Sequence, residues 1–192
     1  EMAIPVIDMA NSSNIMAQIA TACETTGFFQ LLNHGIEHSL MDRVKEVCKE
    51  NYKLNREGKF NESLPVRKLN NLRLEQLNGN NSTECDIDWE DIFTIEHLQK
   101  TDSWPSRPRD FKEKIEEFQE EIFTLAEKLL EIISLNLGLE KGYVKEAFAG
   151  GEKPFFGTKV SHYPPCPRPD LIQGLRAHTD AGGLILLFQD DE

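Results

Sequence analysis

The chain has 192 residues, of which 39% are apolar and 8% aromatic, so it can build one compact domain with a hydrophobic core and is not a disordered chain. Thirty-three acidic residues against 21 basic ones give a formal net charge of −12, and such a surface repels nucleic acid and anionic membranes. No basic segment followed by an apolar core opens the sequence, and no run approaches the roughly 18 apolar residues of a membrane helix. We therefore expect a soluble, cytoplasmic protein that binds a small molecule or another protein, and neither nucleic acid nor membrane.

The four cysteines are widely separated and form no C-x-x-C pair: they are Cys23, Cys48, Cys85 and Cys166. Their spacing suits neither a zinc site nor a dense disulfide framework. We expect reduced thiols, which agrees with a cytoplasmic protein.

In the N-terminal quarter the hydrophobic pattern predicts short strands over 4–8 and 28–32, separated by a helix. Ser12 and Ser13 are expected to cap this helix, which ends at Gly27. A turn at 33–35 then leads to a second helix, and the alternation of strands and helices indicates compact α/β packing.

The middle of the chain contains a polar segment and a long amphipathic one. Residues 61–86 are rich in Asn, Ser and Glu, and we expect a mobile surface insertion with weak order. From Asp110, a predicted cap, apolar residues recur at three- and four-residue steps as far as Leu137, and Gly138 follows. This pattern predicts one long scaffold helix packed along a sheet.

The last 40 residues read as successive strands. The pattern predicts a strand over 155–163, a rigid proline connector at 164–169 and a second strand over 174–180. After a break at 181–183, a third strand is expected over 184–189. Successive strands predict an antiparallel sheet or a barrel.

His178 and Asp180 lie two residues apart on the second of these strands, so both side chains project from one face and can contact one metal ion. Two His and one carboxylate form the facial triad of non-haem iron(II) oxygenases, which leaves positions open for substrate and oxygen. The pair supplies two of these three ligands. H-x-D alone is a weak signal, and a surface Asp paired with His is the ordinary alternative.

Period-two alternation puts further polar side chains beside this pair. Arg176 shares the face of His178 and Asp180. One face of the preceding strand carries Lys159, Ser161 and Tyr163. If these faces point inward, two cations and a phenol line a pocket for a small carboxylate; if they point outward, they are solvated surface. Alternation alone leaves both readings open.

Two stretches are distinctive: Phe-Gly-Thr-Lys-Val-Ser at 156–161 and Arg-Ala-His-Thr-Asp-Ala-Gly-Gly at 176–183. Tyr-Pro-Pro-Cys-Pro at 163–167 lies between them, and Asp-Trp-Glu at 88–90 and Asn-Leu-Gly-Leu-Glu-Lys-Gly-Tyr at 136–143 precede them. In this order the residues resemble the 1-aminocyclopropane-1-carboxylate oxidase family of plant non-haem iron(II) oxygenases. The resemblance spans essentially the whole chain.

For the fold, the resemblance implies the α+β class: a helical N-terminal region and a long scaffold helix packed on the first strands of a double-stranded β-helix (jelly roll), truncated. The expected regions are 1–106 for the N-terminal part, 107–153 for the scaffold helix and connector, and 154–192 for the start of an incomplete jelly roll.

For the chemistry, the resemblance implies that Fe(II) oxidises 1-aminocyclopropane-1-carboxylate with O2, with ascorbate as cosubstrate and CO2 or bicarbonate as activator, in the last step of ethylene biosynthesis. His178 and Asp180 carry over as iron ligands. Lys159 and Arg176 carry over as catalytic-pocket cations that hold ascorbate, bicarbonate or the substrate carboxylate, and Tyr163 as a wall against the substrate. The inward reading of their face follows from the resemblance.

The family's second iron-binding His, and an Arg-x-Ser pair beyond it, would fall after Glu192. We therefore expect an N-terminal portion whose iron site is incomplete. Two alternatives remain: a 2-oxoglutarate-dependent hydroxylase or desaturase of the same superfamily, and an inactive truncated product.

Overall fold

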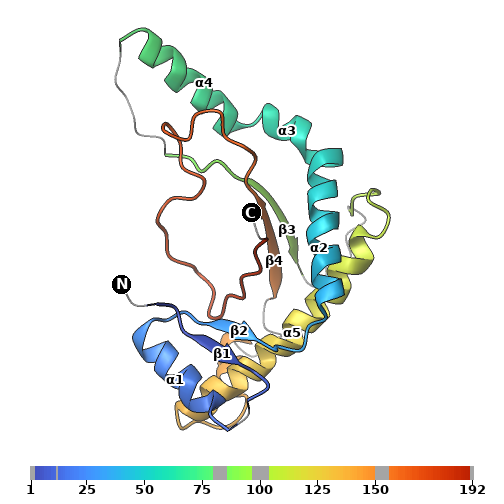
Figure 1. Cartoon of the computed structure of the whole chain (residues 1–192), viewed down its shortest axis with the longest axis vertical. Helices are drawn as coiled ribbons and strands as arrows, with labels where there is room; N and C mark the ends of the chain where they lie inside the picture. The colour runs from blue at the N-terminus through green and yellow to red at the C-terminus, as the bar shows by residue number, and fades with distance from the viewer. Residues whose placement is uncertain (1–2, 12, 80–85, 97–103, 150–155, 191–192) are drawn as a thin grey trace. The chain divides into compact units, whose positions relative to one another are not determined.

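A computed structural model describes residues 3–11, 13–79, 86–96, 104–149 and 156–190 (Figure 1). The chain divides into two compact units, each assembled from separated segments. The first unit comprises 1–42, 116–156 and 182–192, and the second comprises 43–115 and 157–181. Both contain helices and a two-stranded sheet, which confirms the α+β class.

The first unit is built around a parallel strand pair. Strand β1 (Val6–Asp8) pairs with β2 (Gln30–Leu32), and helix α1 (Ile15–Thr25) forms the crossover between them. Parallel neighbours need such a crossover, which explains why a helix separates two short strands. Ile7 in β1 is fully buried.

The C-terminal end of α1 agrees with the sequence prediction, whereas its N-terminal cap does not. Gly27 has φ +69°, the left-handed conformation that suits glycine after a helix, as predicted. The predicted serine cap is wrong for Ser13, whose hydroxyl donates to the side chain of Asn11 instead, 2.9 Å away. Asn14 is the capping position and makes no side-chain cap bond, while Ser12 lies outside the described residues.

The predicted scaffold helix is confirmed as α5 (Phe111–Asn136), 26 residues long. Its apolar positions are buried as the periodicity requires: Phe111, Ile115, Phe118, Leu125 and Leu129. Gly138 follows with φ +72°. Asp110, the expected cap, uses its carboxylate for a two-pronged ion pair with Arg43 at 2.7 and 2.9 Å. Helix α6 (Tyr143–Ala149) follows α5.

The second unit begins with a helical run. Helix α2 (His38–Asn51), which starts in the first unit, continues as a π-helical turn (Tyr52–Arg56), and α3 (Glu57–Asn61) and α4 (Leu64–Leu77) follow it. Strand β3 (Asp91–Glu96) pairs antiparallel with β4 (Gly157–His162).

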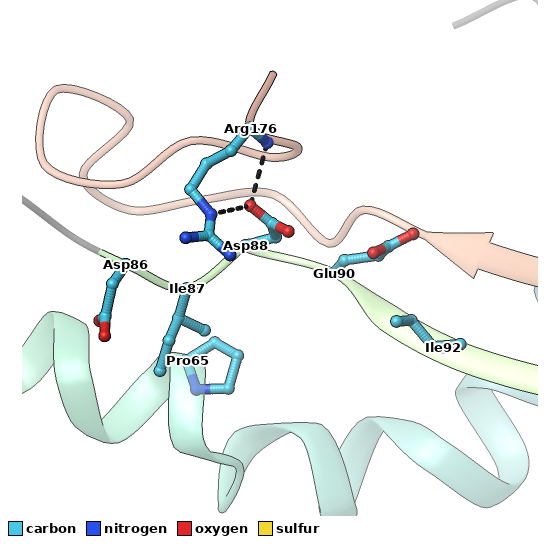
Figure 2. Close-up of a pocket in the computed structure, with 7 residues that line it drawn as sticks. All are labelled: Pro65, Asp86, Ile87, Asp88, Glu90, Ile92 and Arg176. Carbon is cyan, nitrogen blue, oxygen red and sulfur yellow. Dashed lines mark hydrogen bonds and ion pairs between the residues drawn. The ribbon is translucent and has the colours of Figure 1, made fainter. Parts of the chain in front are cut away.

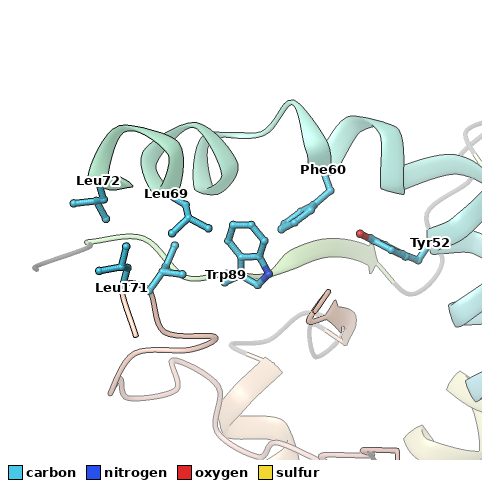
Figure 3. Close-up of a cluster of buried hydrophobic side chains, with 7 residues drawn as sticks. Tyr52, Phe60, Leu69, Leu72, Trp89 and Leu171 are labelled. Atoms are coloured by element: carbon cyan, nitrogen blue, oxygen red, sulfur yellow. The ribbon is translucent and has the colours of Figure 1, made fainter. Parts of the chain in front are cut away.

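The core of this unit contradicts the expectation of weak order over 61–86. Within that range α4 is a regular helix, and its Leu69 and Leu72 are 2% and 7% exposed. They pack with Tyr52, Phe60, Trp89, Leu171 and Ile172 (Figure 3). The polar composition concealed a leucine stripe that covers Trp89; residues 80–85 lie outside the described residues.

The strands predicted over 174–180 and 184–189 are not formed. A strand needs a partner for its backbone groups, and neither segment is paired with another strand in the described part of the chain. The strand predicted over 155–163 exists as β4. The described part of this region thus forms one antiparallel pair, β3–β4. The jelly roll stays a prediction, as does the three-region division of the chain.

No helix in the described ranges has both the length and the apolar character needed to cross a membrane. The three cysteines in these ranges, Cys23, Cys48 and Cys166, are free thiols, as expected; Cys85 falls outside them.

Candidate functional site

Strand β4 has two chemically different faces. Lys159 and Ser161 point to one face, opposite Thr94 and Ile92 of β3, and Tyr163 continues that face beyond the strand. The other face carries His162, whose ring stacks on Tyr52 with centroids 3.8 Å apart. The helices therefore cover the His162 face and leave the lysine face more open.

The three side chains of the open face converge on Glu90, the residue before β3. The Lys159 ammonium lies 2.9 Å from Glu90 Oε1, and the Tyr163 hydroxyl donates to the same oxygen at 3.1 Å. The Ser161 side chain also hydrogen-bonds to Glu90. Lys159 is about half exposed, but the Glu90 side chain is only 3% exposed. Glu90 is thus the inner partner of this group.

Electrostatics keep this carboxylate charged. Burial raises the pKa of Glu90, but hydrogen bonds from Lys159, Ser161 and Tyr163 outweigh it, so the pKa lies below its ordinary value of 4.5. Burial and the neighbouring Glu90 charge raise the pKa of Tyr163, so its phenol stays protonated and can donate.

Arg176 is held by a second carboxylate on the same segment. Asp88 Oδ1 accepts hydrogen bonds from the Arg176 backbone N–H at 2.9 Å and from its guanidinium Nε at 2.7 Å (Figure 2). This contact with Arg176 holds the pKa of Asp88 below its usual value. Both residues line an open pocket of about 300 Å³, together with Pro65, Asp86, Ile87, Glu90 and Ile92.

Trp89 anchors the segment between these two carboxylates. Its side chain is buried against Phe60, with ring centroids 5.1 Å apart. Its indole N–H donates to the Pro164 carbonyl at 2.8 Å, and its backbone N–H donates to the Gln173 carbonyl at 2.8 Å. Because neighbouring residues of an extended chain face opposite ways, a buried Trp89 turns Asp88 and Glu90 toward the pocket.

His178 and Asp180 come together as predicted, although not on a strand. His178 Nε2 lies 3.3 Å from Asp180 Oδ1, and each side chain is about half exposed. His178 Nδ1 lies 2.9 Å from the Arg176 carbonyl oxygen, which can only accept, so Nδ1 carries a proton, and in the neutral imidazole Nε2 then has the lone pair. In that form a nitrogen and a carboxylate oxygen face each other across 3.3 Å, an arrangement that can accept a cation.

These donors fit iron(II), which accepts imidazole nitrogen and carboxylate oxygen. Across the described ranges, no group of three or more His, Cys, Asp or Glu side chains could hold a metal ion. That the pair supplies two of the three protein ligands of a facial triad stays a prediction.

The structure thus brings Lys159 and Tyr163 together through Glu90, and Arg176 next to His178 through the His178 contact with the Arg176 carbonyl. Sequence reasoning missed Asp88 and Glu90. The available signal was their alternation around an apolar Trp89. Only the pairing of β3 with β4 shows that Glu90 meets Lys159, and only the hydrogen bonds of Arg176 show that it meets Asp88.

We expect Asp88→Asn to weaken the dependence of the free energy of unfolding on pH at acidic pH. A carboxyl whose folded pKa is depressed adds stability that is fully present above its unfolded pKa of about 3.9 and is lost as pH falls through the lower folded pKa. The difference in free energy of unfolding between wild type and Asp88→Asn should therefore shrink below about pH 4. Urea titrations from about pH 2.5 to 7 measure it, and a difference that is independent of pH would contradict the charged Asp88–Arg176 contact.

Comparison with known protein families extends this picture. Residues 4–121 match the family described as non-haem dioxygenase in morphine synthesis N-terminal, and residues 155–192 match the 2OG-Fe(II) oxygenase superfamily. The chain is 54% identical to a 1-aminocyclopropane-1-carboxylate oxidase of Musa acuminata over 100% of this chain and 62% of that protein. It is 50% identical to 1-aminocyclopropane-1-carboxylate oxidase 5 of Arabidopsis thaliana over 100% of this chain and 63% of that protein.

Solved structures show a similar fold. The crystal structure of JOX2 in complex with 2OG, Fe and JA has a TM-score of 0.69 and 34% identity, covering 94% of this chain and 54% of that one. A 2OG-Fe(II) oxygenase family protein from Caulobacter crescentus has a TM-score of 0.55 over 87% of this chain and 58% of that one, with 17% identity, which shows likeness of fold alone. The chain spans less than two thirds of each of these proteins.

Proposed function

Because this chain belongs to the non-haem dioxygenase family matched over residues 4–121, we propose that the protein carrying it is an iron(II)-dependent oxidase that forms ethylene from 1-aminocyclopropane-1-carboxylate. O2 is the oxidant, ascorbate the cosubstrate, and CO2 or bicarbonate the activator. The observation that carries the proposal is identity of 54% over the whole chain to an oxidase of that name.

In this proposal His178 Nε2 and the Asp180 carboxylate hold iron(II). The bound iron supplies the activation of O2 for oxidation. The Nδ1–H···O=C contact with Arg176 keeps the His178 ring oriented and Nε2 available. A third protein ligand completes the site.

The pocket residues bind and orient the substrate. Lys159 and Arg176 hold the carboxylate of the substrate, ascorbate or bicarbonate, and Tyr163 forms a wall against the substrate. Each cation already has an acidic partner, Glu90 or Asp88, so the anion shares the cation with that partner. Such sharing favours a small zwitterion, whose own positive charge suits the acidic surroundings.

Two further elements belong to the proposal. The β3–β4 pair is the beginning of a double-stranded β-helix, supported by the likeness to solved oxygenases. The protein works in the cytoplasm, supported by its net charge of −12 and by the three free thiols of the described ranges.

The test is a gas-chromatographic ethylene assay on the natural polypeptide that carries this sequence, with Fe(II), 1-aminocyclopropane-1-carboxylate, bicarbonate and air. We expect ethylene that depends on ascorbate and not on 2-oxoglutarate. Succinate formed from 2-oxoglutarate, without ethylene, would establish the hydroxylase or desaturase alternative. Absence of both products would favour the inactive product.

A further inference from the structure

We propose that Glu90 is a positioning residue, whose carboxylate holds Lys159 and Tyr163 on the open face of β4. The role it would serve in turnover rests on the proposed function. The contact itself does not, and can be tested without any substrate.

The geometry singles out Glu90 because one carboxylate collects every polar side chain of that face. Lys159 Nζ and the Tyr163 hydroxyl lie 2.9 and 3.1 Å from the same oxygen, Oε1. Ser161, between them in sequence, hydrogen-bonds to Glu90 as well. Residues 159, 161 and 163 share a face by alternation, and the β3–β4 register brings that face to Glu90.

Burial explains why this arrangement is stiff. The Glu90 side chain is 3% exposed, so water cannot solvate its carboxylate. Breaking its contacts would leave a buried charge without partners, which is costly. Trp89, anchored to two backbone carbonyls, prevents the segment from moving away. The half-exposed Lys159 is therefore oriented by an inner group that is itself fixed.

This arrangement has a consequence for ligand binding. An ammonium group has three N–H donors, and the Glu90 contact uses one, which leaves two for an anionic group at the open face of β4. Tyr163 donates its only O–H to Glu90, so its oxygen is left as an acceptor for a ligand. Glu90 thus determines which donors and acceptors the substrate meets.

The primary test measures Lys159 with an amine-reactive reagent at about pH 8, with the labelled peptide quantified by mass spectrometry. Glu90→Gln keeps the side-chain size and removes the charge. We expect Lys159 labelling to rise about three- to tenfold, because loss of the carboxylate partner releases the ammonium group from its ion pair. Unchanged labelling would overturn the proposal.

Asp91→Asn is the matched control. Asp91 is the next residue, its side chain is 11% exposed, and it pairs with Arg56 at 2.5 Å on the opposite face. The Asp91→Asn substitution therefore removes a comparable ion pair from the same segment without touching Glu90. We expect Lys159 labelling within about twofold of wild type. A rise equal to that of Glu90→Gln would show a general loosening of β3 and overturn the positioning role.

A double-mutant cycle then connects the contact to turnover. If Glu90 acts through Lys159, Glu90→Gln should reduce ethylene formation about tenfold in wild type but less than about twofold in a Lys159→Gln background. Equal reductions in both backgrounds would contradict positioning. If no variant, wild type included, forms ethylene while labelling follows the expected pattern, the proposed function fails and the positioning role stands.

Discussion

Replacing Trp89 by alanine is expected to lower the free energy of unfolding by about 3–5 kcal/mol, the usual cost of truncating a buried aromatic. Trp89 is 6% exposed, packs edge to face on Phe60, and donates its indole N–H to the Pro164 carbonyl. The change removes both the packing and the hydrogen bond. Because the free energy of unfolding of a domain is commonly about 5–15 kcal/mol, this loss would be a large fraction of it.

The measurement is urea unfolding of the natural polypeptide followed by far-UV circular dichroism, since the change removes one of only two tryptophan fluorophores in this sequence. Trp89→Phe keeps a ring and loses the N–H donor, so we expect an intermediate loss of about 1–2 kcal/mol. Phe28→Ala is the exposed control: Phe28 is 68% exposed, and its loss should stay within about 0.5 kcal/mol. A Trp89→Ala loss no larger than that of the control would contradict the core described for the second unit.

Elements with strong local periodicity were predicted well from the sequence. Helix α5 buries the residues that recur at three- and four-residue steps, and Gly27 and Gly138 adopt positive φ just beyond their helices. In these cases the residues that determine the structure are neighbours in sequence. Such elements can be predicted without knowing which distant residues they contact.

Helix α4 was mistaken for a mobile insertion because its burial is decided by distant residues. Composition over 61–86 is polar, yet Leu69 and Leu72 are covered by Trp89 and by Leu171, which lies far along the chain. A polar window with a few leucines is typical of loops and of amphipathic helices alike. Only the partner surface distinguishes them.

The strands expected at 174–180 and 184–189 failed for a related reason. Alternation and apolar runs describe a segment able to pair, whereas a strand exists only where a neighbour supplies the hydrogen bonds. The predicted proximity of His178 and Asp180 is nevertheless observed, because their side chains meet within a loop. Spacing of two residues was sufficient for that contact.

Replacing His178 by alanine is expected to weaken iron(II) binding about 100-fold or more, since loss of a ligand exceeds the roughly 10- to 100-fold typical of its supporting contacts. The remaining Asp180 is half exposed, and one solvated carboxylate does not retain a divalent ion. Anaerobic calorimetric titration of the natural polypeptide measures the affinity, and ethylene formation should be lost with it.

His38→Ala is the matched control, because His38 is an exposed residue at the start of α2 and should leave iron affinity unchanged. Arg176→Ala removes the guanidinium but keeps the backbone carbonyl that contacts His178 Nδ1. The substitution therefore separates the side-chain role of Arg176 in the pocket from its backbone support of His178. We expect it to retain iron binding within about fivefold, since backbone support of the ligand persists, while substrate affinity falls. Iron binding that survived His178→Ala would show that the metal is held elsewhere, and the pairing of His178 Nε2 with Asp180 would then be an ordinary surface contact.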